Sequence, residues 1–301
     1  MTEELAWLDY FVPLDSTHRT EDIPNNKRLL GDNVDDDYPL KQAKLAWNIG
    51  QNQKQYTSSY GSTFEVPVTS LSNRYFLIHE STTFQKTYSK VPLLIFFHGL
   101  NSTAWYSAVF RTKWIEHANT ENFLLVFGQG QGDEFPDGPI RDKYGDLLFG
   151  DLYWEIEEPK TDFIYLDSIL EYMKQHYENR LDVSRIYFVG YSNGALFSCN
   201  VAIHYGGGVF AAICNHCGGY GGGYKDEKLL NPNTIKKVIP IYLLTGTSDA
   251  YRSSCERAKM LFEGVGCDVK MDIMENRGHN YYQDKELDIW TFLMLYRING
   301  D

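Results

Sequence analysis

Along most of the chain, short continuous apolar runs alternate with longer stretches in which apolar residues recur every three or four positions. The apolar runs at 91–97, 123–127 and 186–189 predict strands that are buried on both faces. Further strands are predicted at 74–79, 209–213, 239–244 and 269–274. The helical pattern predicts helices around 41–49, 104–118, 162–178, 195–203, 255–262 and 284–297.

Repeated strand–helix units with buried strands predict an α/β fold, in which a mainly parallel sheet carries helices on both faces. Residues 1–60 are polar and irregular, and we interpret them as an N-terminal extension to a main domain that spans 61–301. Within that domain, the segment 128–160 is rich in Gly, Asp and Pro, and the segment 215–235 is rich in Gly. Such segments are predicted to be loops that form a rim or lid.

The composition limits the partners of this domain. Of the 301 residues, 43 % are hydrophobic, which is enough for a full core, and the formal charge is −12. Such an acidic chain repels phosphate backbones and anionic lipid headgroups, so neither nucleic acid nor a membrane is an expected partner. No run approaches the roughly 18 apolar residues of a membrane span. The first residues lack a secretory signal, so we expect a cytoplasmic protein.

The five cysteines are an odd number, which is typical of a reducing compartment rather than of a disulfide framework. Cys214-Asn215-His216-Cys217 has the spacing of half a zinc site. A structural zinc ion needs four ligands, and no second half with ligand spacing follows. We therefore predict free thiols and no metal.

The strongest chemical signal is Gly190-Tyr191-Ser192-Asn193-Gly194. A chain of this length contains G-x-S-x-G by chance roughly one time in ten, so the pattern alone is only suggestive. Here an apolar strand ends on the motif and a small-residue helix follows it, which is the context of a nucleophile elbow. We predict that Ser192 is a nucleophile.

A serine hydroxyl needs an adjacent base, and the base needs an orienting acid. One known order along the chain is Ser, then Asp or Glu, then His. His279 lies in a polar loop between the last strand and the last helix, and it is our predicted base. His216 stays open as an alternative, whereas His204 lies on the helix that leaves the motif.

The acid is predicted to be Asp249, because it follows an apolar strand at the sheet edge where sites form in open α/β sheets. Asp268 and Asp272 lie next to or within the following strand and are less suitable. An oxyanion hole needs two backbone donors. We predict the N–H groups of Asn193 and Leu100, the second of which follows His98-Gly99 after an early strand.

Together these residues resemble the polyhydroxybutyrate depolymerase-like esterases, a group with feruloyl and acetyl xylan esterases. The resemblance covers roughly 70–298. The motifs that carry it are Arg74-Tyr75-Phe76-Leu77, His98-Gly99, Gly190-Tyr191-Ser192-Asn193-Gly194-Ala195, Gly246-Thr247-Ser248-Asp249 and Gly278-His279. It implies an α/β-hydrolase fold, the triad Ser192, Asp249 and His279, and oxyanion amides at Leu100 and Asn193.

The sequence thus predicts a serine carboxylic ester hydrolase that acts on a small-molecule ester through an acyl-enzyme and needs no cofactor. Aromatic side chains near these motifs are candidates for a substrate pocket. They are Trp105, Tyr106, Trp154, Tyr191 and Tyr281. Two alternatives stay open: a thioesterase or peptidase that uses the same triad, and a hydrolase-like binding protein without turnover.

Overall fold

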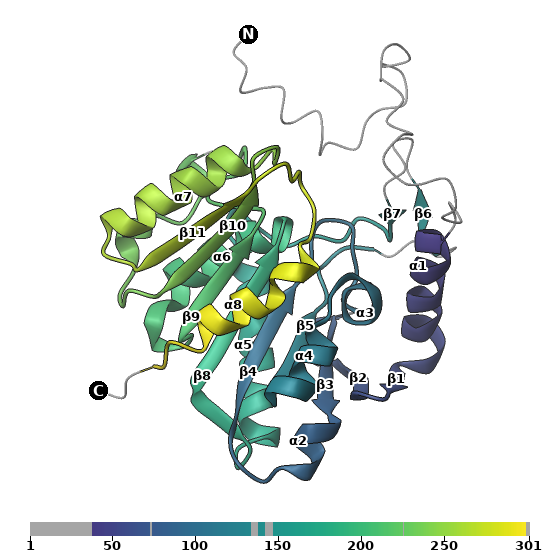
Figure 1. Ribbon diagram of the computed structural model, residues 1–301. Coiled ribbons are helices and arrows are strands. Elements are labelled where there is room, and N and C mark those ends of the chain that lie inside the picture. Colours follow the sequence, from purple (N-terminus) through teal and green to yellow (C-terminus); the bar gives the residue numbers. More distant parts are fainter. Residues whose placement is uncertain (1–37, 73, 134–137, 142–146, 225, 299–301) are drawn as a thin grey trace, which may run out of the picture.

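The computed structural model describes residues 38–298, apart from 73, 134–137, 142–146 and 225. These residues form one large sheet with helices on both of its faces (Figure 1). Most of the predicted N-terminal extension, residues 1–37, lies outside the described part. The predicted boundary at residue 60 falls in the turn between two adjacent strands of the sheet.

The sheet contains nine strands in the order β1-β2-β3-β5-β4-β8-β9-β10-β11. Their bounds are β1 Gln55–Ser58, β2 Gly61–Pro67, β3 Tyr75–Ser81, β4 Val91–Phe97, β5 Leu124–Gly128, β8 Leu181–Tyr191, β9 Ala212–His216, β10 Ile241–Gly246 and β11 Val269–Met274. The first three strands run antiparallel to their neighbours, and β3 pairs antiparallel with β5. From β5 to β11 every pair is parallel.

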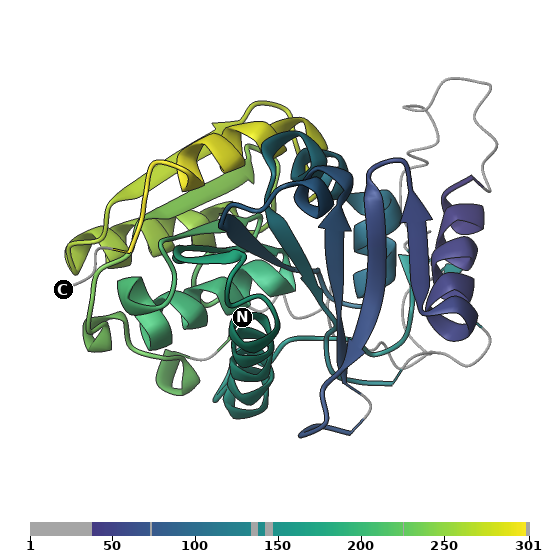
Figure 2. The same cartoon turned by 90° about the horizontal axis from the view of Figure 1, so that it is seen from below.

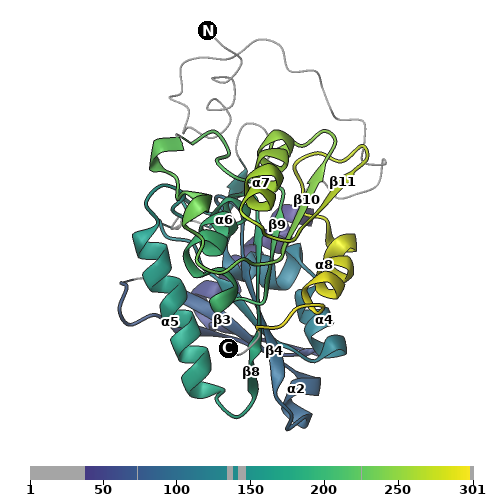
Figure 3. The same ribbon diagram turned by 90° about the vertical axis from the view of Figure 1, so that its left-hand side faces the viewer.

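Helices cover both faces of the sheet (Figures 1 and 3). On one face lie α5 Lys160–His176, α6 Asn193–Tyr205 and α7 Arg252–Gly264. The opposite face carries α1 Tyr38–Asn48, α3 Ala104–Tyr106, α4 Trp114–Glu121 and α8 Glu286–Leu293. A further short helix, α2 Thr82–Lys86, follows β3. Figure 2 shows the sheet between these two layers from below.

The central strand β4 explains why the sheet is parallel at its middle. All seven of its residues are buried, so both faces of the strand need apolar cover. Leu93, Ile95 and Phe97 belong to the core under α5 and α6, and Leu94 and Phe96 belong to the core under α4 and α8. A strand with two buried faces is typical of a sheet that has helices on both sides.

Most predicted elements agree with the structure, and the fold class is confirmed, but three regions differ. The predicted helix at 104–118 is interrupted: α3 continues as a π-helical turn, η4 Ser107–Arg111, and α4 begins three residues later. The hairpin of β1 and β2 was not predicted. Among the described residues of 128–160 there are also two short strands, β6 Ile140–Arg141 and β7 Leu147–Leu148.

The other small helical elements either adjoin α1, α6 and α8 or lie in loops. They are η3 Ile49–Gln53, η5 Gly206–Gly208, η6 Asp226–Lys228, η7 Pro232–Thr234 and η8 Gln283–Lys285. Two of them, η6 and η7, fall in the predicted rim segment 215–235. In the described part of the chain, no helix has the length and apolar character needed to cross a bilayer.

Candidate active site

Ser192 occupies a strained turn between β8 and α6. Its φ and ψ angles are 53° and −115°, a conformation that residues with a Cβ atom rarely adopt. Strain of this kind costs on the order of 1–3 kcal/mol and persists only where the surroundings enforce it. The Ser192 N–H donates to the His216 carbonyl at 2.9 Å, which ties the turn to the end of β9.

The two glycines of the motif are required by close backbone approaches. A Cβ atom on Gly190 would lie 2.1 Å from the Gly194 carbonyl oxygen. One on Gly194 would lie 2.4 Å from the Phe97 carbonyl oxygen. The motif is therefore compressed between its own helix and the end of β4, and this packing presents the serine at the sheet edge.

Ser192, His279 and Asp249 form a continuous chain of hydrogen bonds. The Ser192 Oγ atom is 2.8 Å from His279 Nε2, and His279 Nδ1 is 3.0 Å from an Asp249 carboxylate oxygen. Asp249 also accepts hydrogen bonds from the Tyr251 N–H at 2.8 Å and from the Thr245 hydroxyl at 3.0 Å. The three residues come from the loops after β8, β10 and β11, which end at the same edge of the sheet.

The charge of Asp249 is set by two opposing effects. Burial alone would raise the pKa of its carboxyl group. The hydrogen bonds from His279, Cys217 and the Tyr251 N–H outweigh this effect, together with the attraction of His279, and lower the pKa to about 2. Asp249 is thus an anion at neutral pH, and it can hold the His279 imidazole with one nitrogen facing Ser192 and stabilise its protonated form.

The predicted oxyanion donors lie beside this triad. The Gly99 backbone approaches Ser192 so closely that a Cβ atom on Gly99 would lie 3.1 Å from the Ser192 Cβ. Leu100 is the next residue in that loop, and Asn193 follows the serine. Within the described part of the chain, neither of their N–H groups donates to another protein group. Both are therefore free to donate to a substrate oxygen.

His98 and Trp154 anchor the oxyanion loop. His98 Nδ1 lies 2.7 Å from the Gly99 carbonyl oxygen, and His98 Nε2 accepts from the Gly130 N–H at 2.9 Å. The Trp154 indole N–H donates to the His98 carbonyl at 2.8 Å. Burial lowers the pKa of His98 to about 4, so this imidazole stays neutral and serves as a structural hydrogen-bonding group.

The other histidines that follow Ser192 lie away from its hydroxyl. His216 is fully buried, and its Nε2 atom accepts from the Tyr282 N–H at 3.2 Å. Burial and, to a smaller extent, the nearby His279 lower the pKa of His216 to about 3. His204 stacks on Phe163 at 4.0 Å between ring centroids. The structure thus brings His279, rather than either alternative, to Ser192.

The alternative acids have other partners. Asp268 accepts a hydrogen bond from the Tyr296 hydroxyl at 2.6 Å. Asp272 accepts one from the Tyr242 hydroxyl and forms an ion pair of 3.3 Å with Lys270. Neither aspartate is near His279, so Asp249 alone of the three orients the imidazole.

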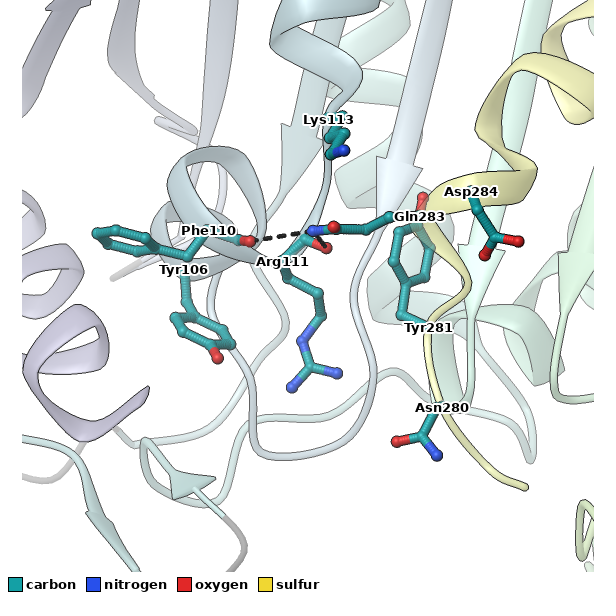
Figure 4. Close-up of a pocket in the computed structure, with 8 residues that line it drawn as sticks. All are labelled: Tyr106, Phe110, Arg111, Lys113, Asn280, Tyr281, Gln283 and Asp284. Carbon is teal, nitrogen blue, oxygen red and sulfur yellow. Dashed lines mark hydrogen bonds between the residues drawn. The ribbon is translucent and has the colours of Figure 1, made fainter. Parts of the chain in front are cut away.

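An open pocket of about 570 Å³ lies next to the triad (Figure 4). Two of the predicted pocket residues, Tyr106 and Tyr281, line it. Tyr191 packs beneath the site. Its ring stacks on that of His279, with 5.7 Å between the ring centroids. The pocket also contains charged side chains that the sequence analysis did not identify, Arg111 and Lys113. Arg111 lies in the stretch predicted as a regular helix, where nothing in the pattern distinguishes it.

Trp105 and Trp154 do not line this pocket, which corrects the extent of the predicted pocket. Both are 1 % exposed. Trp154 stacks on Phe97 with 3.8 Å between ring centroids, in the core under α5. Trp105 packs against α1 and the residues that follow it. These indoles stabilise the loops around the site and do not contact its open space.

One group of potential metal ligands occurs in the described part of the chain: Cys217, Asp249 and His279, with donor atoms within 4.8 Å of one another. Cys214 and His216 of the predicted half-site are not part of it. Asp249 already accepts the hydrogen bonds that orient the triad, and burial raises the pKa of the Cys217 thiol. The arrangement therefore suits a hydrogen-bonded triad. All five cysteines are free and buried.

Comparisons with known proteins place this geometry in context. An uncharacterised hydrolase of Acanthamoeba polyphaga mimivirus is 34 % identical over an alignment of 313 positions that covers 96 % of this chain and 97 % of the relative. No protein-family model matches the chain. The solved structure of an S-formylglutathione hydrolase from Agrobacterium tumefaciens has a TM-score of 0.60 at 16 % identity, over 81 % of this chain and 98 % of that one.

Two further solved structures are similar to this chain. The fluorophosphonate-binding serine hydrolase F of Staphylococcus aureus has a TM-score of 0.55 at 13 % identity, over 79 % of this chain and 98 % of that one. A ferulic acid esterase has a TM-score of 0.53 at 13 % identity, over 77 % and 96 % of the two chains. At such identities these structures show the fold. The predicted resemblance to esterases and hydrolases with the α/β-hydrolase fold is confirmed.

Proposed function

The chain belongs to the same family as the mimivirus hydrolase and has the α/β-hydrolase fold, and from this premise we propose that it is a serine carboxylic ester hydrolase. The observation that carries the proposal is the hydrogen-bond chain from Ser192 through His279 to Asp249. A serine hydroxyl at a strained elbow, with an imidazole at 2.8 Å and a buried carboxylate behind it, has the parts that acyl transfer needs.

In the proposed reaction the Ser192 oxygen attacks the ester carbonyl carbon while His279 accepts the serine proton. Asp249 keeps the imidazole oriented and stabilises its protonated form. The N–H groups of Leu100 and Asn193 stabilise the negative charge that develops on the carbonyl oxygen. His279 then gives the proton to the leaving alcohol, which leaves an acyl group on Ser192.

The second half of the reaction repeats these steps with water. His279 removes a proton from a water molecule, and the resulting hydroxide attacks the acyl carbon. The carbon–oxygen bond to Ser192 then breaks, and His279 returns the proton to the serine. The product is a carboxylic acid, and the enzyme is regenerated without any external cofactor.

Steady-state hydrolysis of short p-nitrophenyl esters tests the proposal. Ser192→Ala and His279→Ala should each lower kcat by about 10⁴–10⁶, and the double variant should lose little more, because the two residues act as a unit. His204→Ala, on the exposed side of α6, should behave as the wild-type protein does. If the wild-type protein hydrolyses only thioesters or peptides, the triad is retained but the substrate class is wrong.

We also place the proposed enzyme in the cytoplasm. Five buried free cysteines support this location, because such thiols are typical of a reducing compartment. The acidic composition supports a small-molecule ester as substrate rather than a nucleic acid.

A further inference from the structure

Arg111 is a half-buried cation that lines the pocket beside the triad. Its guanidinium carbon lies 5.3 Å from the centre of the Tyr106 ring and 5.6 Å from that of the Tyr191 ring. Figure 4 shows the guanidinium group projecting away from Lys113, with Tyr106 on one side and Asn280 on the other. The Tyr106 and Tyr191 rings thus hold the guanidinium group in place, and one end of this group faces the pocket.

No carboxylate of a described residue neutralises this charge. Among the described residues, none places an acidic oxygen within 4.0 Å of Arg111, and its Nε atom is buried without a hydrogen-bond partner. A half-buried guanidinium is ordinarily paired, because removing an ion from water is costly unless another charge or hydrogen bond compensates. The Tyr191 hydroxyl is a hydrogen-bond partner of Arg111. No described carboxylate pairs with the guanidinium group, however, and in a chain with a net charge of −12 an arginine in this position calls for a functional explanation.

The acidic residue of the pocket has a different partner. Asp284 accepts two hydrogen bonds from Arg277, at 2.6 and 2.7 Å, so its charge is already matched. Lys113, which also lines the pocket, is exposed and adds a second positive charge at its rim. The pocket therefore presents a positive potential to an incoming ligand.

The pocket is adjacent to the reacting atoms. One ring, that of Tyr191, separates Arg111 from His279: it lies next to the guanidinium group and stacks on the imidazole at 5.7 Å. Asn280 and Tyr281, which directly follow the base, form part of the pocket wall. A small molecule whose ester bond lies at Ser192 can therefore place a second group at Arg111.

We infer that Arg111 is a specificity residue that binds an anionic group, such as a carboxylate, on the ester substrate. This inference rests on the proposed esterase function and narrows its substrate class to esters that carry a negative charge. A guanidinium group can donate two parallel hydrogen bonds to a carboxylate, and its aromatic neighbours hold it ready for this contact.

The test compares anionic and neutral esters of the same shape. On the acyl side, the p-nitrophenyl monoester of adipic acid is compared with p-nitrophenyl isooctanoate, in which a branched end replaces the carboxylate. On the alcohol side, m-acetoxybenzoate is compared with m-acetoxybenzamide. For each pair the readout is the ratio of kcat/KM for the anionic ester to kcat/KM for the neutral one. The pair with the higher ratio shows which half of the substrate carries the charge.

The wild-type protein should favour the anionic ester of at least one pair. Arg111→Met should lower that ratio by about tenfold or more, the value of a charge-assisted hydrogen bond, and leave turnover of the neutral ester intact. Arg111→Lys should retain part of the preference. Lys90→Met is the matched control, because it removes an exposed charge beside the opposite end of β4 and should leave the ratio unchanged.

The outcomes separate this inference from the proposed function. If neutral esters are hydrolysed but Arg111→Met leaves the ratio unchanged, Arg111 does not recognise an anion, and the esterase proposal stands. If Arg111→Met lowers the turnover of both esters equally, Arg111 supports the fold of the site and the inference is overturned. If no ester of either pair is hydrolysed, the proposed function itself fails.

Discussion

At the scale of single residues, the site depends on positions that only glycine can occupy. Gly190 and Gly194 allow β8, α6 and the end of β4 to meet within van der Waals contact of one another. The motif, its strand and its helix could be recognised in the sequence, because each has a local signal. So could Asp249 and His279, since both follow predicted strands in the required order.

Arg111 could not be recognised, because its environment is not local. Tyr191 is 80 positions away along the chain, and Asn280 is still farther. Only the folded structure shows that the guanidinium group has aromatic neighbours and, among the described residues, no carboxylate within 4.0 Å. The same reason explains why Trp105 and Trp154 were included in the pocket: an aromatic residue next to a motif can face the substrate or the core, and sequence adjacency does not decide which.

The first prediction concerns Gly190. Gly190→Ala should destabilise the protein by about 3 kcal/mol or more, because its Cβ atom would overlap the Gly194 carbonyl group and force the elbow apart. Any folded fraction should lose ester hydrolysis. Urea unfolding checks the stability. Gly208→Ala is the matched control, since a Cβ atom there meets nothing within 4 Å. Equal stability of the two variants would show that the elbow is not compressed.

At the scale of elements, the break between η4 and α4 separates the predicted helix into two parts. The Gln283 side-chain amide donates to the Phe110 and Arg111 carbonyls at 3.2 and 2.7 Å, as Figure 4 shows. The buried Glu286 carboxylate accepts from the Lys113 N–H at 3.1 and 3.0 Å. These partners satisfy backbone groups that a continuous helix would have paired internally. They come from near α8, so the helical pattern of 104–118 gives no sign of them.

A buried ion pair joins β3 to α5. Arg74 and Asp162 are 2.9 Å apart, with side chains 6 % and 0 % exposed. Asp162 also accepts from the Glu155 N–H at 2.6 Å, which fixes the segment that carries Trp154. Arg74 lies over the Tyr165 ring at 3.9 Å. Arg74 thus has a structural role in the motif that carried the family resemblance.

Breaking this pair should be costly. We expect Asp162→Asn to lower the free energy of unfolding by about 3–5 kcal/mol, because it leaves the Arg74 charge buried without its partner. The double variant with Arg74→Met and Asp162→Asn removes both charges, and it should recover part of the unfolding free energy that Asp162→Asn alone loses. Glu157→Gln, which breaks an exposed pair with Lys228, should have little effect. Denaturant titration measures the three variants against the wild-type protein, and a loss in Asp162→Asn no larger than that in Glu157→Gln would contradict the assignment.

At the scale of the whole molecule, the parallel strands and β3 were predictable from the sequence, whereas the β1–β2 hairpin at the antiparallel edge was not. Strands such as β4 are buried on both faces and appear as continuous apolar runs. β1 is a short edge strand with no buried residue, and its sequence, Gln55-Tyr56-Thr57-Ser58, has neither an apolar run nor strict alternation. It pairs with β2 because the hairpin brings the backbones together.

Buried histidines predict how the fold responds to acid. Burial lowers the pKa of His79 and His98 to about 4 and that of His216 to about 3, from an ordinary value of 6.5. In the unfolded chain these imidazoles bind protons near pH 6.5, whereas in the folded protein they stay neutral. Acid therefore favours unfolding, and stability falls as the pH drops from about 6.5 toward 4.

Between pH 8 and pH 5, each of the three histidines should lower the free energy of unfolding by about 2 kcal/mol. Denaturant titrations at the two pH values measure the difference. Replacing His98 with Gln should reduce the pH dependence, even if it lowers stability overall, while the exposed His204→Gln should not change it. A free energy of unfolding that is constant between pH 8 and pH 5 would show that these histidines are not buried in the neutral form.

The central claim is that Ser192 is the nucleophile, and active-site labelling tests it most directly. A fluorophosphonate should transfer one phosphonyl group to the native protein with loss of fluoride, and peptide mapping by mass spectrometry should locate it on Ser192. Heat-denatured protein and Ser192→Ala should remain unlabelled, and His279→Ala should react far more slowly. Labelling of another residue, or of Ser192→Ala at the wild-type rate, would contradict the account.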